Sequence, residues 1–253
     1  MTVAEQAVSI GFCTASRLSV HIPMQSQISL VIVGATGMVG RYALRCALEH
    51  PAVGRVTAIG RKRLGMSHPK LVEIQHQDFG DCSSLGEVLK EQNAVVFCLG
   101  AYTGAVPDAE LRRITVDYTI EFARVFHDSS PDAAFSFLSG SGADPTERSR
   151  ILFARIKGEA ENALLAAGFP RVYIFRPAYI YPVEPRKEPN LTYRLLRWSY
   201  PVFRMLFPNQ VIRADDLANA MVDVAVRGTG AREGLVFENR DIRAIAASFH
   251  PAR

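Results

Sequence analysis

The sequence is poor in cysteine and contains no long apolar run. Its four cysteines are Cys13, Cys46, Cys82 and Cys98, without a CxxC pair or a Cys/His cluster. This spacing argues against a disulfide framework or a zinc site and favours reduced thiols, so we expect a cytoplasmic protein. No stretch approaches the roughly 18 consecutive apolar residues that a membrane span needs, which argues against a transmembrane protein.

A strong charge of either sign is also missing. The 253 residues include 29 Lys and Arg against 25 Asp and Glu, with 48% hydrophobic and 21% charged residues. These proportions are typical of a packed domain and exclude disorder over most of the chain. The net charge of +4 suits anionic ligands, but it is too dispersed to predict a nucleic acid partner. We expect a small-molecule substrate, and the composition does not indicate an oligomeric state.

Residues 1–27 are nearly free of charge. Glu5 is their only acid and Arg17 their only Lys or Arg. Acid-poor segments include targeting peptides, but a basic cluster followed by a long apolar stretch is absent here. We therefore favour a disordered tail, or a chain that starts at Met24.

Short apolar strands alternate with helices over residues 28–248, which we interpret as one domain. Strands are predicted at residues 29–33, 55–59, 71–74, 94–99, 133–138, 171–175 and 234–237. Helices are predicted at residues 38–49, 83–91, 108–125, 147–167 and 215–226. This alternation is typical of an α/β fold with a doubly wound, mainly parallel sheet. A small C-terminal elaboration is expected at about residues 180–212.

A glycine-rich loop, GATGMVG, follows the first predicted strand and opens a helix. Its first glycine permits a tight turn, its second lets the backbone approach a pyrophosphate, and its third lets helix and strand pack closely. The N–H groups at the helix start favour phosphates. The loop therefore predicts a dinucleotide on a Rossmann-type sheet. The expected contacts are Gly34, Thr36, Gly37, Met38, Val39 and Gly40.

Cations follow the second predicted strand, where an NAD site typically has an acid for the ribose 2′-hydroxyl. The residues are Arg61, Lys62 and Arg63. The Arg61 guanidinium suits a 2′-phosphate and can lie on the adenine. We therefore predict NADP, with NAD as the alternative, although a solvated basic loop would have the same composition.

An ordered set of further motifs carries a family resemblance. The motifs are GATGMVG, FCLGAYTG, ITVDYTIEFA, FLSGSGADP, IKGEAE and FRPAYIY. Together they resemble the atypical short-chain dehydrogenase/reductases, in particular the NAD(P)-binding oxidoreductases similar to the human Tat-interacting tumour-suppressor protein. The NmrA-like group is a looser match. Some of these relatives are redox-sensing or assembly proteins rather than enzymes.

The resemblance implies further cofactor contacts. Asp78 is expected to meet the adenine amino group, and Phe79 either lines the adenine pocket or belongs to the core. Leu99 and Gly100 end the fourth strand, where the chain would pass the ribose. Pro177 follows the sixth strand, at the nicotinamide end.

The catalytic motif that the resemblance implies is incomplete. The family uses a serine after the fifth strand and a Tyr-x-x-x-Lys pair, in which the tyrosine moves a proton and the lysine holds the nicotinamide ribose. Ser139 and Lys157 match the serine and the lysine, whereas Phe153 stands at the tyrosine position. A phenyl ring carries no exchangeable proton. Either the protein binds the cofactor without reducing anything, or the proton comes from elsewhere. The candidate sources are a water held by Ser139 and Lys157, or one of Tyr102, Tyr179 and Tyr181.

Three functions follow from these patterns. The leading hypothesis is an NADP-dependent oxidoreductase acting on a small or lipophilic carbonyl compound. The alternative is a catalytically weak NADP(H)-binding sensor or scaffold. A third hypothesis is a membrane-surface assembly factor that uses the basic and aromatic segment 191–207, although that segment also fits a lid or a packed helix. We expect no firm membrane association.

Overall fold

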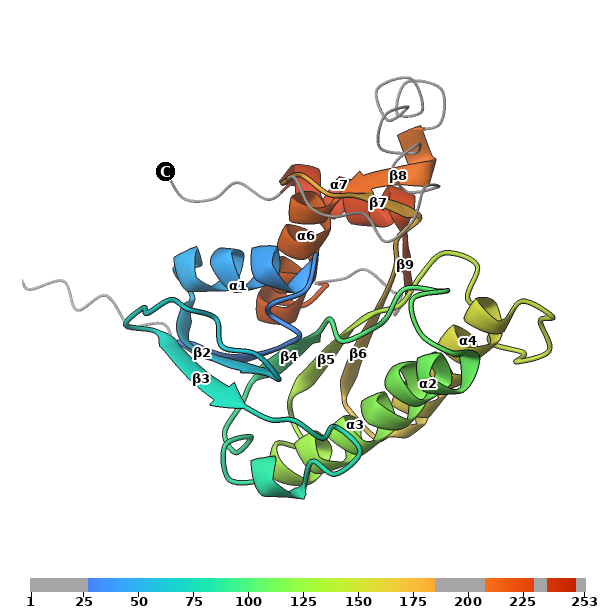
Figure 1. The fold of residues 1–253 in the computed structure, drawn as a ribbon. Helices are drawn as coiled ribbons and strands as arrows, with labels where there is room; N and C mark the ends of the chain where they lie inside the picture. Colours follow the sequence, from blue (N-terminus) through green and yellow to red (C-terminus); the bar gives the residue numbers. More distant parts are fainter. Residues whose placement is uncertain (1–26, 185–207, 230–235, 249–253) are drawn as a thin grey trace, which may run out of the picture.

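A parallel sheet of seven strands forms the centre of the molecule (Figure 1). The computed structural model describes residues 27–184, 208–229 and 236–248. The strand order is β3-β2-β1-β4-β5-β6-β9, and every neighbouring pair in it is parallel. The strands are β1 (Ile28–Val33), β2 (Val53–Gly60), β3 (Leu71–Gln75), β4 (Ala94–Phe97), β5 (Ala134–Leu138), β6 (Arg171–Arg176) and β9 (Val236–Glu238). The predicted α/β fold with a doubly wound parallel sheet is confirmed.

Helices cover both faces of this sheet (Figure 1). They are α1 (Gly40–Glu49), α2 (Asp108–Arg112), α3 (Tyr118–Ser129), α4 (Leu152–Ala166), α6 (Ala214–Arg227) and α7 (Asn239–Ser248). One face packs against α1, α6 and α7, and the other against α2, α3 and α4. Both faces of the central strands are buried: Leu30 and Ile32 of β1 enter one core, and Val31 and Val33 the other.

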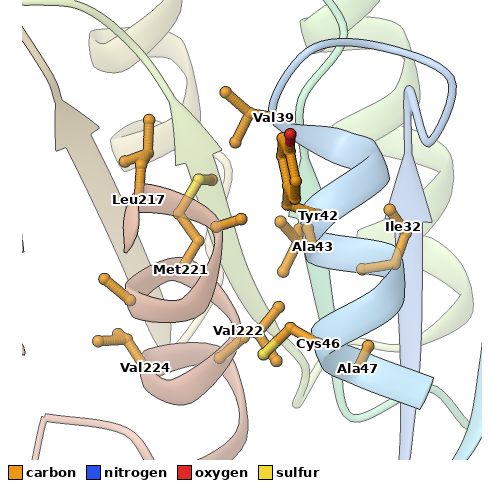
Figure 2. Close-up of a cluster of buried hydrophobic side chains, with 14 of the residues drawn as sticks. Ile32, Val39, Tyr42, Ala43, Cys46, Ala47, Leu217, Met221, Val222 and Val224 are labelled. Carbon is orange, nitrogen blue, oxygen red and sulfur yellow. The ribbon is translucent and has the colours of Figure 1, made fainter. Parts of the chain in front are cut away.

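The face formed by α1 and α6 is held by small and branched side chains. Val39, Tyr42 and Cys46 on the α1 side meet Leu217 and Met221 of α6 (Figure 2). Met221 and Leu217 are fully buried. This packing anchors the helix that opens at the glycine loop.

Three helix predictions differ from the structure. The helix expected over 108–125 is interrupted by a π-helical turn at Arg113–Asp117, and the one expected over 83–91 is a single 3₁₀ turn at Ser83–Leu85. The helix expected from residue 147 begins at Leu152 as α4. The reason is Asp144, whose carboxylate accepts hydrogen bonds from the backbone N–H groups of residues 146, 148 and 149 and so stabilises a turn there.

The C-terminal part contains elements that the sequence patterns did not predict. Strands β7 (Tyr179–Tyr181) and β8 (Val211–Arg213) form a separate parallel pair, and α7 follows β9. Strands β7 and β8 lie at the two ends of the elaboration expected at about residues 180–212, whereas α7 lies after it. The segment 191–207 and nearly all of the predicted tail at 1–27 lie outside the described residues. Among the described helices, none is long and apolar enough to cross a membrane.

Candidate functional site

A cavity of about 420 Å³ opens at the carboxyl ends of the central strands. It lies where the strand order reverses between β1 and β4, which is the place where open α/β sheets bind ligands. Its walls come from the loops after β1, β4, β5 and β6 and from α4. Many predicted site residues meet there, namely Thr36, Gly37, Met38, Val39, Leu99, Gly100, Ser139, Lys157 and Pro177.

The glycine loop is too tight for side chains. Gly34 has a φ of +82°, and a Cβ on it would lie 3.0 Å from the Cys98 carbonyl carbon. A Cβ on Gly40 would lie only 2.2 Å from the Gly34 carbonyl oxygen. Because this turn closes on itself, it brings the start of α1 directly to the cavity wall.

The three cations after β2, Arg61, Lys62 and Arg63, are exposed. A narrow hollow there is lined by Thr36, Gly60, Lys62 and Glu73, among others. Glu73 accepts a hydrogen bond of 2.8 Å from the Leu64 N–H, which folds the basic segment back over β3. Glu73 could not be recognised from the sequence as part of this hollow, because it lies on β3 and not next to the basic segment in the chain. The parallel register, which pairs Ala58 with Glu73, brings it beside the end of β2.

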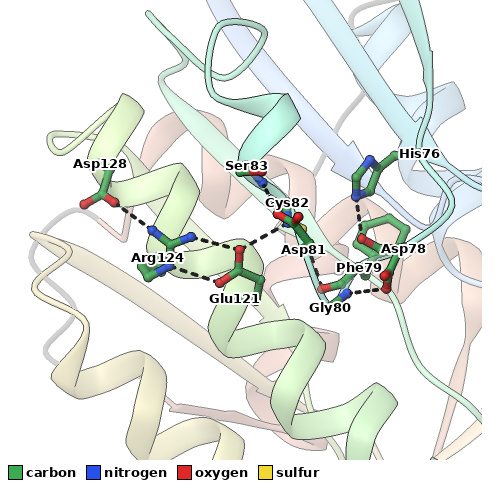
Figure 3. Close-up of polar contacts among 10 residues, drawn as sticks. All are labelled: His76, Asp78, Phe79, Gly80, Asp81, Cys82, Ser83, Glu121, Arg124 and Asp128. Atoms are coloured by element: carbon green, nitrogen blue, oxygen red, sulfur yellow. Dashed lines mark hydrogen bonds and ion pairs between the residues drawn. The ribbon is translucent and has the colours of Figure 1, made fainter.

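The turn after β3 does not line the cavity. Asp78 is exposed, and its Oδ1 accepts from the Gly80 N–H at 2.9 Å (Figure 3). Phe79 is 1% exposed and packs in the core beside Tyr118 and His76. The geometry of Phe79 therefore agrees with a core role rather than a place in the cavity wall.

A charged contact fastens this turn to α3. Glu121 accepts a 3.1 Å hydrogen bond from the Cys82 N–H and pairs with Arg124 at 2.9 Å (Figure 3). The Arg124 guanidinium is the main reason that the pKa of Glu121 lies below its ordinary value. Arg124 also pairs with Asp128 at 3.3 Å.

Lys157 is buried at the base of the cavity. Its Nζ donates to the Leu138 carbonyl oxygen at 3.0 Å and lies 4.9 Å from the centre of the Phe137 ring. Burial lowers the pKa of Lys157 to about 8, and the attraction of Glu161 limits the decrease. The Lys157 ammonium is thus fixed by these two contacts in the cavity wall.

Phe153 faces the loop after β5. A Cβ on Gly140 would lie 2.5 Å from the Cζ atom of the Phe153 ring, so the ring tip rests on the bare glycine backbone. Both residues line the cavity. The position where the resemblance implies a tyrosine thus carries an apolar ring in the cavity wall.

Ser139 belongs to a buried polar network. Its hydroxyl donates to Glu161 Oε1 in a short contact, and Glu161 is 1% exposed. Arg176 donates to both carboxylate oxygens of Glu161, at 3.1 Å and 2.5 Å, and reaches Glu238 at 3.3 Å. The sequence analysis missed Glu161, although it lies four residues after Lys157 and so on the same side of α4.

The other candidate proton sources are divided. Tyr102 and Tyr179 line the cavity, and the Tyr102 hydroxyl lies 3.6 Å from the Met38 sulfur. Tyr181 is not part of the cavity wall within the described residues. Cys98 is half-buried and also lines the cavity.

The sequence matches a family model described as the NAD dependent epimerase/dehydratase family over residues 30–213. A similar curated protein is mitochondrial protein fmp52 of Aspergillus clavatus, 32% identical over 158 residues that cover 60% of this chain and 66% of that one, just under two thirds. Rat protein HTATIP2 is 26% identical over 66% of this chain and 68% of its own. The resemblance inferred from the motifs is confirmed. The expected cytoplasmic location is wrong, because several fungal relatives are named mitochondrial.

Two solved structures share the fold. The Bordetella bronchiseptica enzyme WbmH, in complex with NAD⁺, gives a TM-score of 0.61 at 18% identity over 81% of this chain and 74% of its own. DesIV, a dTDP-glucose 4,6-dehydratase from Streptomyces venezuelae with NAD bound, gives 0.60 at 18% identity over 87% and 80%.

Proposed function

Because the chain belongs to the NAD dependent epimerase/dehydratase family, we propose that it is an NADP-dependent oxidoreductase acting on a small or lipophilic carbonyl compound or the corresponding alcohol. The observation that carries this is the glycine loop, where a Cβ on Gly40 would lie 2.2 Å from the Gly34 carbonyl oxygen. This tight turn places Gly37 in the cavity wall, which fits a pyrophosphate at the start of α1.

The residues along the cavity support one orientation of the dinucleotide. The glycine loop would hold the pyrophosphate, and Lys157 would donate to the nicotinamide ribose. Ser139 would form a hydrogen bond with the reacting oxygen. When bound, the nicotinamide ring supplies or accepts the hydride. The apolar rings and chains around it, including Phe153, keep water from the reacting carbon.

The preference for NADP rests on charge. Arg61, Lys62 and Arg63 are exposed beside the hollow that Thr36 lines, and Arg61 offers a fork of donors for a 2′-phosphate. Glu73 in the same hollow is held by the Leu64 N–H. NAD remains the alternative, since the matching structures named above contain NAD.

Calorimetry of the purified protein with NADP and NAD tests the proposal, followed by absorbance assays of NADPH with carbonyl compounds. Gly40→Ala is expected to weaken cofactor binding about tenfold to a hundredfold, because its Cβ forces the loop apart. Gly86→Ala is the matched control, since its Cβ would meet only ordinary contacts at 3.5 Å and beyond. No heat with either cofactor at millimolar concentration would contradict the proposal.

A sensor or scaffold is the second candidate, and Phe153 favours it because the usual proton donor is missing. Tight binding without turnover of any carbonyl compound would support this candidate. Phe153→Tyr would then be expected to produce reduction if the cavity still admits a substrate. The names of the fungal relatives support a mitochondrial location, which imaging of a fluorescent fusion of the full chain tests.

A further inference from the structure

The buried network behind Ser139 fixes the direction of one hydrogen bond at the reacting end of the cavity. We propose that Glu161 is a positioning residue that makes Ser139 an acceptor, so that the cavity selects a substrate hydroxyl over the corresponding carbonyl. The inference rests on the proposed function, because it names the form of the substrate that binds at the same site.

The direction follows from what Glu161 can offer. Arg176 has only hydrogens to give, and it donates to both oxygens of the Glu161 carboxylate. An ionised carboxylate paired in this way accepts hydrogen bonds and donates none. The Ser139 hydroxyl must therefore give its hydrogen to Glu161, and its oxygen lone pairs are left for the cavity.

A neutral carbonyl competes poorly for that hydrogen. Hydrogen bonds to an ionised group are roughly twice as strong as those between neutral groups. Turning the Ser139 hydrogen towards a substrate carbonyl would also take a donor from a carboxylate that is 1% exposed, where water does not replace it readily.

Lys157 provides the complementary donor. An ammonium carries three hydrogens: Lys157 uses one on the Leu138 carbonyl oxygen, and the proposed contact with the nicotinamide ribose takes a second, which leaves one for the substrate. A substrate hydroxyl can accept from Lys157 and donate to Ser139, whereas a carbonyl can only accept. Phe153 adds no donor for a carbonyl, which strengthens the preference.

Glu161→Gln is expected to reverse the polarity of Ser139. Each carboxylate oxygen faces an Arg176 donor, at 2.5 Å for Oε2 and at 3.1 Å for Oε1, so the amide oxygen should take the place of Oε2, where the donor is closer, and leave the NH₂ group at the longer contact. The amide NH₂ then faces Ser139, which accepts from it and turns its own hydrogen into the cavity. Glu238→Gln is the matched control, because it also removes a carboxylate that pairs with Arg176. The Glu238 side chain is 53% exposed and, within the described residues, forms no hydrogen bond with Ser139.

Neutron diffraction from deuterium-exchanged crystals reads the polarity directly and needs neither cofactor nor substrate. The deuteron of Ser139 is expected on the line to Glu161 in the wild type and in Glu238→Gln, and towards the cavity in Glu161→Gln. A wild-type deuteron directed into the cavity would overturn the inference. If Glu161→Gln does not fold, the wild-type result decides.

Ligand binding supplies the second measurement. Cyclohexanol and cyclohexanone are titrated against the protein saturated with oxidised NADP. The ratio of alcohol to ketone affinity is expected to fall about tenfold in Glu161→Gln and to stay unchanged in Glu238→Gln. Ser139→Ala should abolish the discrimination. Equal ratios in the wild type and Glu161→Gln would overturn the inference, and if neither compound binds, the neutron result stands alone. Failure of cofactor binding would instead contradict the proposed function and leave the deuteron positions as evidence.

Discussion

At the scale of the residue, Lys157 combines its proposed role in cofactor binding with a cost in stability. Its pKa of about 8 in the folded protein lies below the ordinary 10.5 because burial disfavours the ammonium. Between these two values the unfolded chain binds more protons than the folded one, so stability rises as the pH increases. Below about pH 8 the full cost of the buried charge is present.

Lys157→Met is therefore expected to raise the free energy of unfolding at pH 7 by about 2 kcal/mol. The displacement of the pKa corresponds to about 3 kcal/mol, and loss of the hydrogen bond to Leu138 offsets about 1 kcal/mol. Urea denaturation between pH 6 and pH 10 measures it, with exposed Lys90→Met as the control. A variant that is less stable than the wild type, or that keeps the wild-type rise above pH 8, would contradict the assignment.

Local geometry could be predicted where it follows from spacing. The tight turn at Gly34, Gly37 and Gly40 was predicted because its three glycines lie within seven consecutive residues. The partners of Glu161 could not be predicted in this way: Ser139 lies 22 residues before it and Arg176 15 residues after it, on neighbouring strands. Their meeting depends on the register of β5 and β6, which local patterns do not encode.

At the scale of the element, the turn at residues 78–83 depends on α3 for its position. Its carboxylate anchor, Glu121, binds the Cys82 N–H at 3.1 Å (Figure 3). Glu121→Ala is expected to loosen the turn and, if Asp78 contacts the adenine, to weaken cofactor binding about threefold to tenfold.

Asp128→Ala is the control for this change, because Asp128 pairs with the same Arg124 but does not touch the turn in the described contacts. Amide hydrogen exchange of residues 80–83 should accelerate in Glu121→Ala only. Faster exchange with unchanged affinity would place the adenine contact elsewhere. Because the pKa of Glu121 is lowered in the folded protein, its stabilising effect should be lost as the pH falls through that pKa.

Elements were predicted best where burial is continuous. Strands β1, β4 and β5 were found because their residues are mainly apolar, with a single serine in each of β1 and β5. The start of α4 was misplaced by five residues, since helical spacing does not register the hydrogen bonds of the Asp144 side chain. Strands β7 and β8 have three residues each, too few to establish an alternating pattern.

At the scale of the whole molecule, the two cores share the strands between them. Met221 of α6 is fully buried in one core and Phe126 of α3 in the other, and both cores include residues of β1 and β4. The helices on one face of the sheet cannot detach without exposing strands that also belong to the other core. We therefore expect a single cooperative unfolding transition.

Met221→Ala should lower the free energy of unfolding by about 2–5 kcal/mol and Phe126→Ala by about 3–5 kcal/mol, each without splitting that transition. Ile120→Ala, at a position 43% exposed on α3, should change it by less than about 1 kcal/mol. Denaturant unfolding followed by both far-UV circular dichroism and tyrosine fluorescence measures the effect. Two separated transitions in Met221→Ala would mean that the face with α1 and α6 unfolds alone. The glycine loop would then be lost while α4 kept Lys157 in place, and cofactor affinity would fall with the first of the two transitions.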